Sequence, residues 1–214
     1  MSDLGKVPAT SATTTKRHSE KTKRRHIMKL LMKRSAVALM LIVSAPSKSI
    51  TPVDIELQLL IDISGSVNTT EYYLQLQGYV NAFRSDSVQQ AIINGTEGQI
   101  ALQMIMWSGQ NAQDISLDWT LIDSTESAEL YADSISAIAR PFAGWTAIGS
   151  VIEYGYPLFS DNGFNGTSLV MDISGDGTNN QGIAPDTARD NALANGIDTI
   201  NGIVITSNQN VIDQ

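Results

Sequence analysis

The chain has 214 residues, enough for one α/β domain with a full hydrophobic core. It contains no cysteine, which excludes disulfides, thiolate metal sites and cysteine nucleophiles. Residues 1–50 hold 11 basic and 2 acidic residues, a net charge of +9, whereas residues 51–214 hold 3 and 20, a net charge of −17. A domain this acidic repels phosphate backbones, so we expect no nucleic acid partner.

The first 48 residues are predicted to be leader sequence. Residues 1–27 are rich in Ser, Thr, Lys and Arg, and we expect them to be disordered or to precede the true start. Residues 28–48 are typical of a secretory signal peptide, because a positive region precedes a short apolar run, 36–43, and the small residues Val43-Ser44-Ala45. The alternative, a membrane anchor, needs roughly 20 apolar residues. We therefore expect an exported protein, periplasmic or extracellular, with no membrane span in its mature form.

The chain's two histidines, His18 and His26, both lie in this basic leader. Residues 51–214 therefore contain no histidine for general base catalysis, nucleophile activation or zinc ligation. Most hydrolase mechanisms use a histidine or a cysteine, so the sequence of this domain disfavours them.

Strand and helix patterns alternate within a predicted domain of residues 53–214. Apolar runs and period-two alternation predict strands over 55–61, 100–107, 115–122, 168–173 and 200–205. Helical spacing and capping residues predict helices over 69–84, 124–139, 146–159 and 185–195. The third strand is expected to form an antiparallel edge, and the fourth is typical of a buried strand.

This order predicts an α/β fold with a doubly wound, mostly parallel sheet and one antiparallel edge strand. Only residues 206–214 follow the last strand, so we expect the C-terminal strand and helix to be missing. The sheet edge is then uncovered, and either the sequence is a fragment or another chain protects the edge.

Three polar segments are predicted to meet at the carboxyl ends of these strands. Asp62-Ile63-Ser64-Gly65-Ser66 follows the first strand, Asp176 follows the fourth, and Thr146 lies in a glycine-rich loop before a helix. Ligands of open α/β sheets bind at such strand ends. Carboxylate and hydroxyl oxygens are hard donors that suit a small divalent cation.

These motifs resemble those of a von Willebrand factor type A (vWA) domain with a metal-ion-dependent adhesion site (MIDAS). The resemblance implies a Rossmann-like vWA fold and a site for Mg²⁺, or Mn²⁺ or Ca²⁺, formed by Asp62, Ser64, Ser66, Thr146 and Asp176. It implies that the hydroxyls touch the metal directly and that the carboxylates act through water. More narrowly, the chain resembles a group of exported bacterial vWA-domain proteins of unknown function. Trp145 departs from the family pattern, because a second glycine often stands there, and it could contact the ligand.

We therefore predict a non-enzymatic, metal-dependent protein-binding module that captures an Asp or Glu of another protein. Two alternatives stay open. One is a magnesium-dependent phosphohydrolase with Asp62 as nucleophile, suggested by the likeness of the loop around Asp176 to a phosphatase magnesium loop. The other is a metal-free scaffold within an envelope complex.

Overall fold

The computed structural model describes residues 49–205. The predicted leader, 1–27, the whole of the predicted signal peptide, 28–48, and the segment 206–214 lie outside the described residues, so these predictions remain untested. All the described residues belong to one compact unit.

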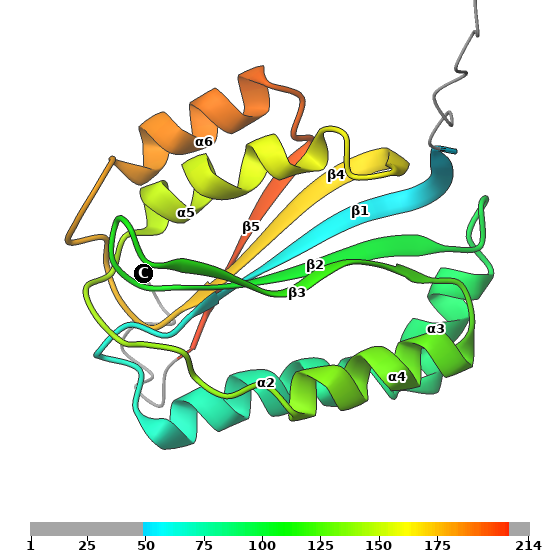
Figure 1. Cartoon of the computed structure of the whole chain (residues 1–214), viewed down its shortest axis with the longest axis horizontal. Helices are drawn as coiled ribbons and strands as arrows, with labels where there is room; N and C mark the ends of the chain where they lie inside the picture. Colours follow the sequence, from blue (N-terminus) through cyan, green and yellow to red (C-terminus); the bar gives the residue numbers. More distant parts are fainter. Residues whose placement is uncertain (1–48, 206–214) are drawn as a thin grey trace, which may run out of the picture. The chain divides into compact units, whose positions relative to one another are not determined.

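Five strands and five α-helices form this unit within the described part of the chain (Figure 1). The strands are β1 (Thr51–Asp62), β2 (Ile100–Trp107), β3 (Gln113–Ile122), β4 (Phe164–Gly175) and β5 (Thr199–Val204). The helices are α2 (Thr69–Phe83), α3 (Asp86–Ile93), α4 (Thr125–Ser136), α5 (Ile148–Gly155) and α6 (Pro185–Ala194), with a 3₁₀ turn η1 (Tyr156–Phe159) after α5.

The strands form one sheet in the order β3-β2-β1-β4-β5. β3 pairs antiparallel with β2, and every other pairing is parallel. Helices α2, α3 and α4 cover one face, and α5 and α6 cover the other (Figure 1). The predicted doubly wound sheet with one antiparallel edge strand is confirmed. After β1 the chain continues to β2 on one side, and after β4 it continues to β5 on the other side. β1 and β4 therefore flank the point where the connections change direction, and the loops that follow them lie side by side at the carboxyl edge of the sheet.

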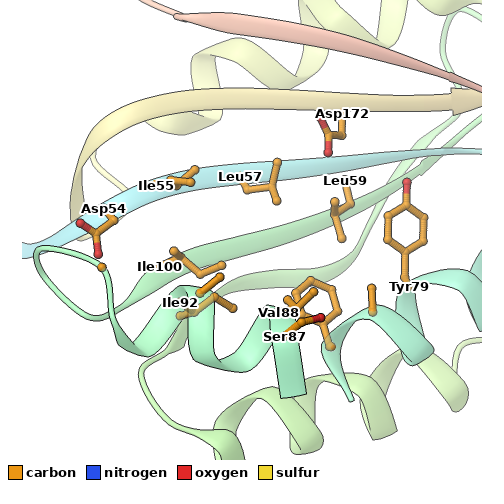
Figure 2. A pocket seen from close by; sticks show the side chains of 14 residues that line it. Asp54, Ile55, Leu57, Leu59, Tyr79, Ser87, Val88, Ile92, Ile100 and Asp172 are labelled. Carbon is orange, nitrogen blue, oxygen red and sulfur yellow. The ribbon is translucent and has the colours of Figure 1, made fainter. Parts of the chain in front are cut away.

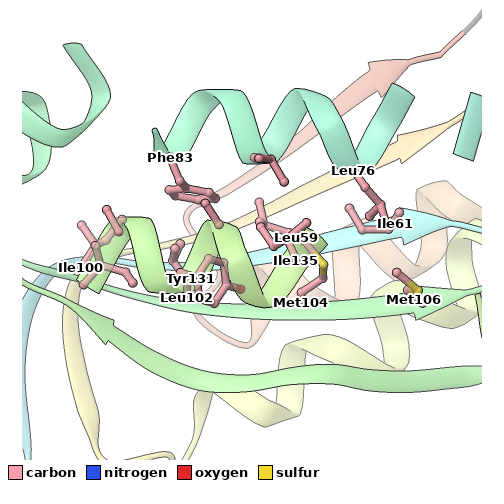
Figure 3. Close-up of a cluster of buried hydrophobic side chains, with 14 of the residues drawn as sticks. Leu59, Ile61, Leu76, Phe83, Ile100, Leu102, Met104, Met106, Tyr131 and Ile135 are labelled. Carbon is pink, nitrogen blue, oxygen red and sulfur yellow. The ribbon is translucent and has the colours of Figure 1, made fainter. Parts of the chain in front are cut away.

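Two hydrophobic cores flank the sheet. On the α2 side, Leu59, Leu102 and Met104 of the central strands pack under Phe83 of α2 and Tyr131 of α4 (Figure 3). The rings of Phe83 and Tyr131 meet edge to face at 5.3 Å, a favourable aromatic geometry. These apolar contacts fix α2 and α4 over β1 and β2, which gives the loop after β1 a rigid base.

Some predicted boundaries were wrong. The helix predicted over 146–159 is α5 followed by η1, because Pro157 has no N–H to continue the α-helical pattern. The helix predicted over 124–139 ends at Ser136. A separate helix, α3, follows α2 because Ser85 caps it. β4 was predicted to be buried throughout 168–173, yet its burial alternates, since helices cover β4 chiefly on the α5–α6 face.

Among the described residues, no helix is both long enough and apolar enough to cross a membrane.

Candidate metal centre

The first segment of the site is the turn that follows β1. The backbone N–H of Ser64 donates to Asp62 Oδ1 over 2.7 Å, a local bond typical of aspartate turns. The hydroxyl oxygens of Ser64 and Ser66 lie 3.0 Å apart. Asp62 and Ser64 are buried, and Ser66 is exposed. The predicted motif therefore runs from the core to the surface at the carboxyl end of the sheet.

Asp176 follows β4, the parallel neighbour of β1. The Ser66 hydroxyl donates to Asp176 Oδ1 over 2.7 Å, joining two residues that are 110 positions apart. The strands also approach closely beneath this bond. A Cβ on Gly175 would lie only 2.9 Å from Asp62 Oδ2, which is closer than real carbon–oxygen contacts. Glycine at 175 thus leaves room for the Asp62 carboxylate.

Thr146 lies in the loop before α5 and is bound to both other segments. The N–H of Gly65 donates to the carbonyl of Gly144 over 2.7 Å. The N–H of Thr146 donates to Asn180 Oδ1 over 2.9 Å, and the N–H of Asn180 donates back to the Thr146 carbonyl over 2.9 Å. These bonds, two between backbone groups and one to the Asn180 side chain, join the loop of Thr146 to the loops after β1 and β4.

The hydroxyls of Ser66 and Thr146 converge above Gly177. A Cβ built on Gly177 would lie 3.8 Å from Ser66 Oγ and 3.9 Å from Thr146 Oγ1. The structure therefore brings together the five predicted ligands from three loops: Asp62, Ser64, Ser66, Thr146 and Asp176.

Asp62 is the electrostatically unusual residue of the group. Its Oδ2 atom is buried and has no hydrogen-bond partner. The pKa of the Asp62 carboxyl is raised to about 6, chiefly by burial and to a smaller extent by the nearby charge of Asp176, while hydrogen bonds from Ser64 and from the Asp176 backbone oppose the shift. A buried carboxylate oxygen without a partner destabilises the fold unless a cation or a water meets it.

The donor set fits a hard divalent cation. Three hydroxyls and two carboxylates offer only oxygen, which Mg²⁺, Mn²⁺ and Ca²⁺ prefer. Over residues 49–205 there is no group of three or more His, Cys, Asp or Glu placed to hold a metal. Any cation at this site would thus depend on hydroxyl and water oxygens in addition to Asp62 and Asp176.

Trp145 lies at the rim of the site, and its side chain is 63% exposed. It directly precedes Thr146, whose side chain is buried.

Two supporting residues were missed in the sequence. Asn180 binds the backbone of Thr146 through its side chain and its N–H. Arg140 donates from its guanidinium to carbonyls of the loop after β1. The only signal for Arg140 was its rarity, since residues 51–214 contain just three basic side chains.

A cavity of about 430 Å³ lies elsewhere, between β1 and helices α2 and α3 (Figure 2). Its lining is mainly apolar, with Asp54, Tyr79 and Asp172 among its polar members. Asp54 and Ile100 belong to the amino ends of β1 and β2. The cavity is therefore separate from the five candidate ligands at the carboxyl ends.

The sheet, its two helix layers and the three converging loops define a vWA fold, as the sequence resemblance predicted. The chain belongs to the family described as Protein of unknown function (DUF1194), whose model matches residues 52–214. No curated protein matches the sequence.

Solved structures of proximal thread matrix protein 1 from the mussel byssus share the fold. One, with a zinc-occupied MIDAS motif, superposes with a TM-score of 0.56 at 19% identity over 72% of this chain. A second crystal form gives a TM-score of 0.55 at 18% identity over 72% of this chain. In both, the match spans 39% of the mussel protein.

Proposed function

We propose that this protein is a non-enzymatic, metal-dependent protein-binding module of adhesion type. The observation that carries the proposal is the convergence of three hydroxyls and two carboxylates around one point, with a buried Asp62 oxygen that lacks a partner. The predicted ligands are Asp62, Ser64, Ser66, Thr146 and Asp176. The cation would be Mg²⁺, or Mn²⁺ or Ca²⁺.

The chain's own residues would leave such an ion open to a partner. Ser66 is exposed, so one side of the site faces solvent. Asp62 is buried and bonded to Ser64, and Asp176 is held by the Ser66 hydroxyl. When bound, the ion would supply a Lewis-acidic position for the carboxylate of an Asp or Glu on another protein. Hydroxyl ligands leave its charge incompletely neutralised, which favours that anion.

Exposed Trp145 beside the site supports a binding surface, because tryptophan adds apolar contact area at low entropic cost. We infer that it contacts the partner next to the captured carboxylate. The mussel protein with a zinc-occupied MIDAS motif supports a divalent ion in this fold.

Binding is favoured over phosphate ester hydrolysis. In the hydrolase alternative Asp62 would attack the substrate, but its side chain has no exposed surface, and Oδ1 accepts the Ser64 N–H. A nucleophile must reach the reacting atom. The absence of histidine and cysteine from residues 49–205 also removes the common general bases and thiol nucleophiles.

We further propose that the protein is exported and acts in the periplasm or outside the cell. The basis is the signal-like sequence of residues 28–48. Detection of a mature protein that begins after residue 45 in the periplasmic or extracellular fraction would support export; a cytoplasmic full-length chain would contradict it.

The metal site is tested by isothermal titration of Mg²⁺ and Mn²⁺ into wild type and into the double variant Asp62→Ala/Ser64→Ala. We expect the double variant to lose affinity by at least about tenfold, since two of the three candidate oxygen ligands in the motif after β1 are gone. The matched control is Asp133→Ala/Ser134→Ala, which removes the same residue types from exposed positions on α4. Equal affinities in wild type and the site variant would refute the metal site.

The partner is sought by capture from envelope extract with Mg²⁺ or with a chelator. A captured protein should be lost with chelator and with Asp62→Ala/Ser64→Ala but not with the α4 control. Capture that is unchanged by the chelator and by the site variant would favour the metal-free scaffold. Turnover of a generic phosphate ester with Mg²⁺, abolished by Asp62→Asn, would favour the hydrolase.

A further inference from the structure

Arg140 contacts the loop that carries the first three candidate ligands. Its Nη1 donates to the Val67 carbonyl over 2.9 Å. Its Nη2 donates to the carbonyls of Ile63 and Ser64 over 2.7 Å and 2.6 Å. One side chain from the segment after α4 therefore holds both ends of the loop from Ile63 to Val67.

The other two arginines of the described chain behave differently. Arg84 pairs with carboxylates on α4, and Arg189 pairs with its neighbour Asp190. Within residues 49–205 the ion pairs involve these two arginines, whereas the guanidinium of Arg140 is directed at main-chain carbonyls. A charged donor makes stronger hydrogen bonds to carbonyls than a neutral one. Residues 51–214 contain 20 acidic residues, yet the guanidinium of Arg140 binds backbone carbonyls. This choice of acceptors indicates a role in fixing the backbone of the loop.

The position of Arg140 is itself fixed by α2. Its guanidinium carbon lies 5.7 Å from the centre of the Tyr72 ring, within range of a cation–π interaction. The Tyr72 hydroxyl donates to the carbonyl of Ile138, two residues before Arg140, over 3.3 Å. Asn68 follows the loop directly and caps α2 by accepting from Thr70 and Glu71. The loop is thus bound at its exit by the α2 cap and along its backbone by Arg140.

We propose that Arg140 is a positioning residue that pre-forms the metal-binding loop before the cation arrives. Three carbonyls satisfied by one guanidinium fix the backbone that places Ser64 and Ser66. The inference rests on the proposed metal-dependent function. If charge repulsion alone mattered, removing the positive charge of Arg140 would strengthen cation binding. The positioning role predicts weaker binding, because the loss of pre-organisation outweighs the loss of repulsion.

The test compares Arg140→Ala and Arg140→Lys with Arg84→Ala, which removes the same charge at a distant ion pair. Isothermal titration of Mg²⁺ gives the affinity. Hydrogen exchange in chelator reports loop order through the N–H groups of Ser64, Gly65 and Val67, which are all hydrogen-bonded. We expect Arg140→Ala to weaken Mg²⁺ binding by about ten- to a hundredfold and to speed exchange in the loop. Arg84→Ala should change neither, and Arg140→Lys should restore part of both.

Affinity for Mg²⁺ that is unchanged or tighter in Arg140→Ala would overturn the positioning role, even if exchange were faster. If Arg140→Ala does not fold, Arg140→Lys decides. Weaker binding at an unchanged melting temperature supports the proposal, and wild-type affinity overturns it. Failure of wild type itself to bind Mg²⁺ or Mn²⁺ would refute the metal-dependent function, and the positioning role with it, which is a result distinct from the others.

Discussion

At the scale of single residues, Asp62 carries a conflict that a cation would resolve. Its carboxylate is buried at the end of β1, one oxygen bonded to Ser64 and the other without a partner. Structural carboxylates usually receive bonds on both oxygens. A cation near Oδ2 would supply the positive charge that the buried carboxylate lacks. Without the cation, ionised Asp62 should lower the free energy of unfolding.

That cost predicts a pH dependence of stability in chelator. Burial raises the pKa of Asp62 from 3.8 in the unfolded chain to about 6 in the folded one. The group's contribution is therefore fully present below pH 3.8 and is lost as the pH rises to about 6. The loss is on the order of 3 kcal/mol. This loss is measured by urea unfolding of wild type and Asp62→Asn between about pH 4 and pH 7. The difference between their free energies of unfolding isolates Asp62, because the other titrating groups contribute equally to both proteins.

We expect wild type to lose stability relative to Asp62→Asn as the pH rises. Addition of Mg²⁺ at about pH 7 should restore the stability of wild type, because a ligand that binds the folded state stabilises it. A difference between the two proteins that does not vary with pH would contradict the assigned burial and charge of Asp62.

At the scale of elements, the site depends on how closely β1 and β4 approach at their carboxyl ends. The β1–β4 pairing runs from Thr51 to Ile61 on β1 and ends beside Gly175. Gly175 has no side chain, and the Asp62 carboxylate occupies the adjacent space. The strand pairing thus sets the distance between the two loops that carry the candidate carboxylates.

Gly175→Ala should therefore damage the site more than the fold. The new Cβ would lie 2.9 Å from Asp62 Oδ2, so the carboxylate must shift. We expect roughly tenfold weaker Mg²⁺ binding, measured by titration. The matched control is Gly78→Ala on α2, where a Cβ meets nothing within 4 Å. That change should leave Mg²⁺ affinity unaltered and stabilise the helix by about 0.5–1 kcal/mol. Equal Mg²⁺ affinities in the two variants would contradict the close approach.

The elements also show how far the sequence can be interpreted. The strands, the antiparallel edge strand and the placement of Asp62 and Asp176 at strand ends follow from local patterns, because strand ends and polar motifs are encoded nearby in the chain. The contacts of Arg140 and Asn180 were not predictable. Each joins residues that are at least 34 positions apart, and no periodicity records which carbonyl a distant side chain will meet. Trp145 was predictable as a candidate contact because it replaces a glycine, but its exposure required the structure.

At the scale of the whole molecule, the net charge of −17 over residues 51–214 acts on both binding and stability. Like charges on one compact surface repel each other, which destabilises the folded state, and the same field attracts cations. Both effects act over distances that salt screens, since the Debye length falls from about 30 Å at 0.01 M to about 3 Å at 1 M ionic strength. Ionic strength should therefore move the two properties in opposite directions.

We expect the melting temperature in chelator to rise as NaCl increases from about 0.01 M to about 1 M, because self-repulsion is screened. The affinity for Mg²⁺ should fall over the same range, because the attractive field is screened. Asp62→Ala/Ser64→Ala provides the control: its melting temperature should rise with salt in the same way, while its residual Mg²⁺ binding stays weak throughout. A melting temperature that falls with salt would show that the acidic residues are arranged to avoid mutual repulsion. A Mg²⁺ affinity that does not change with salt would show that local oxygen ligands alone determine binding.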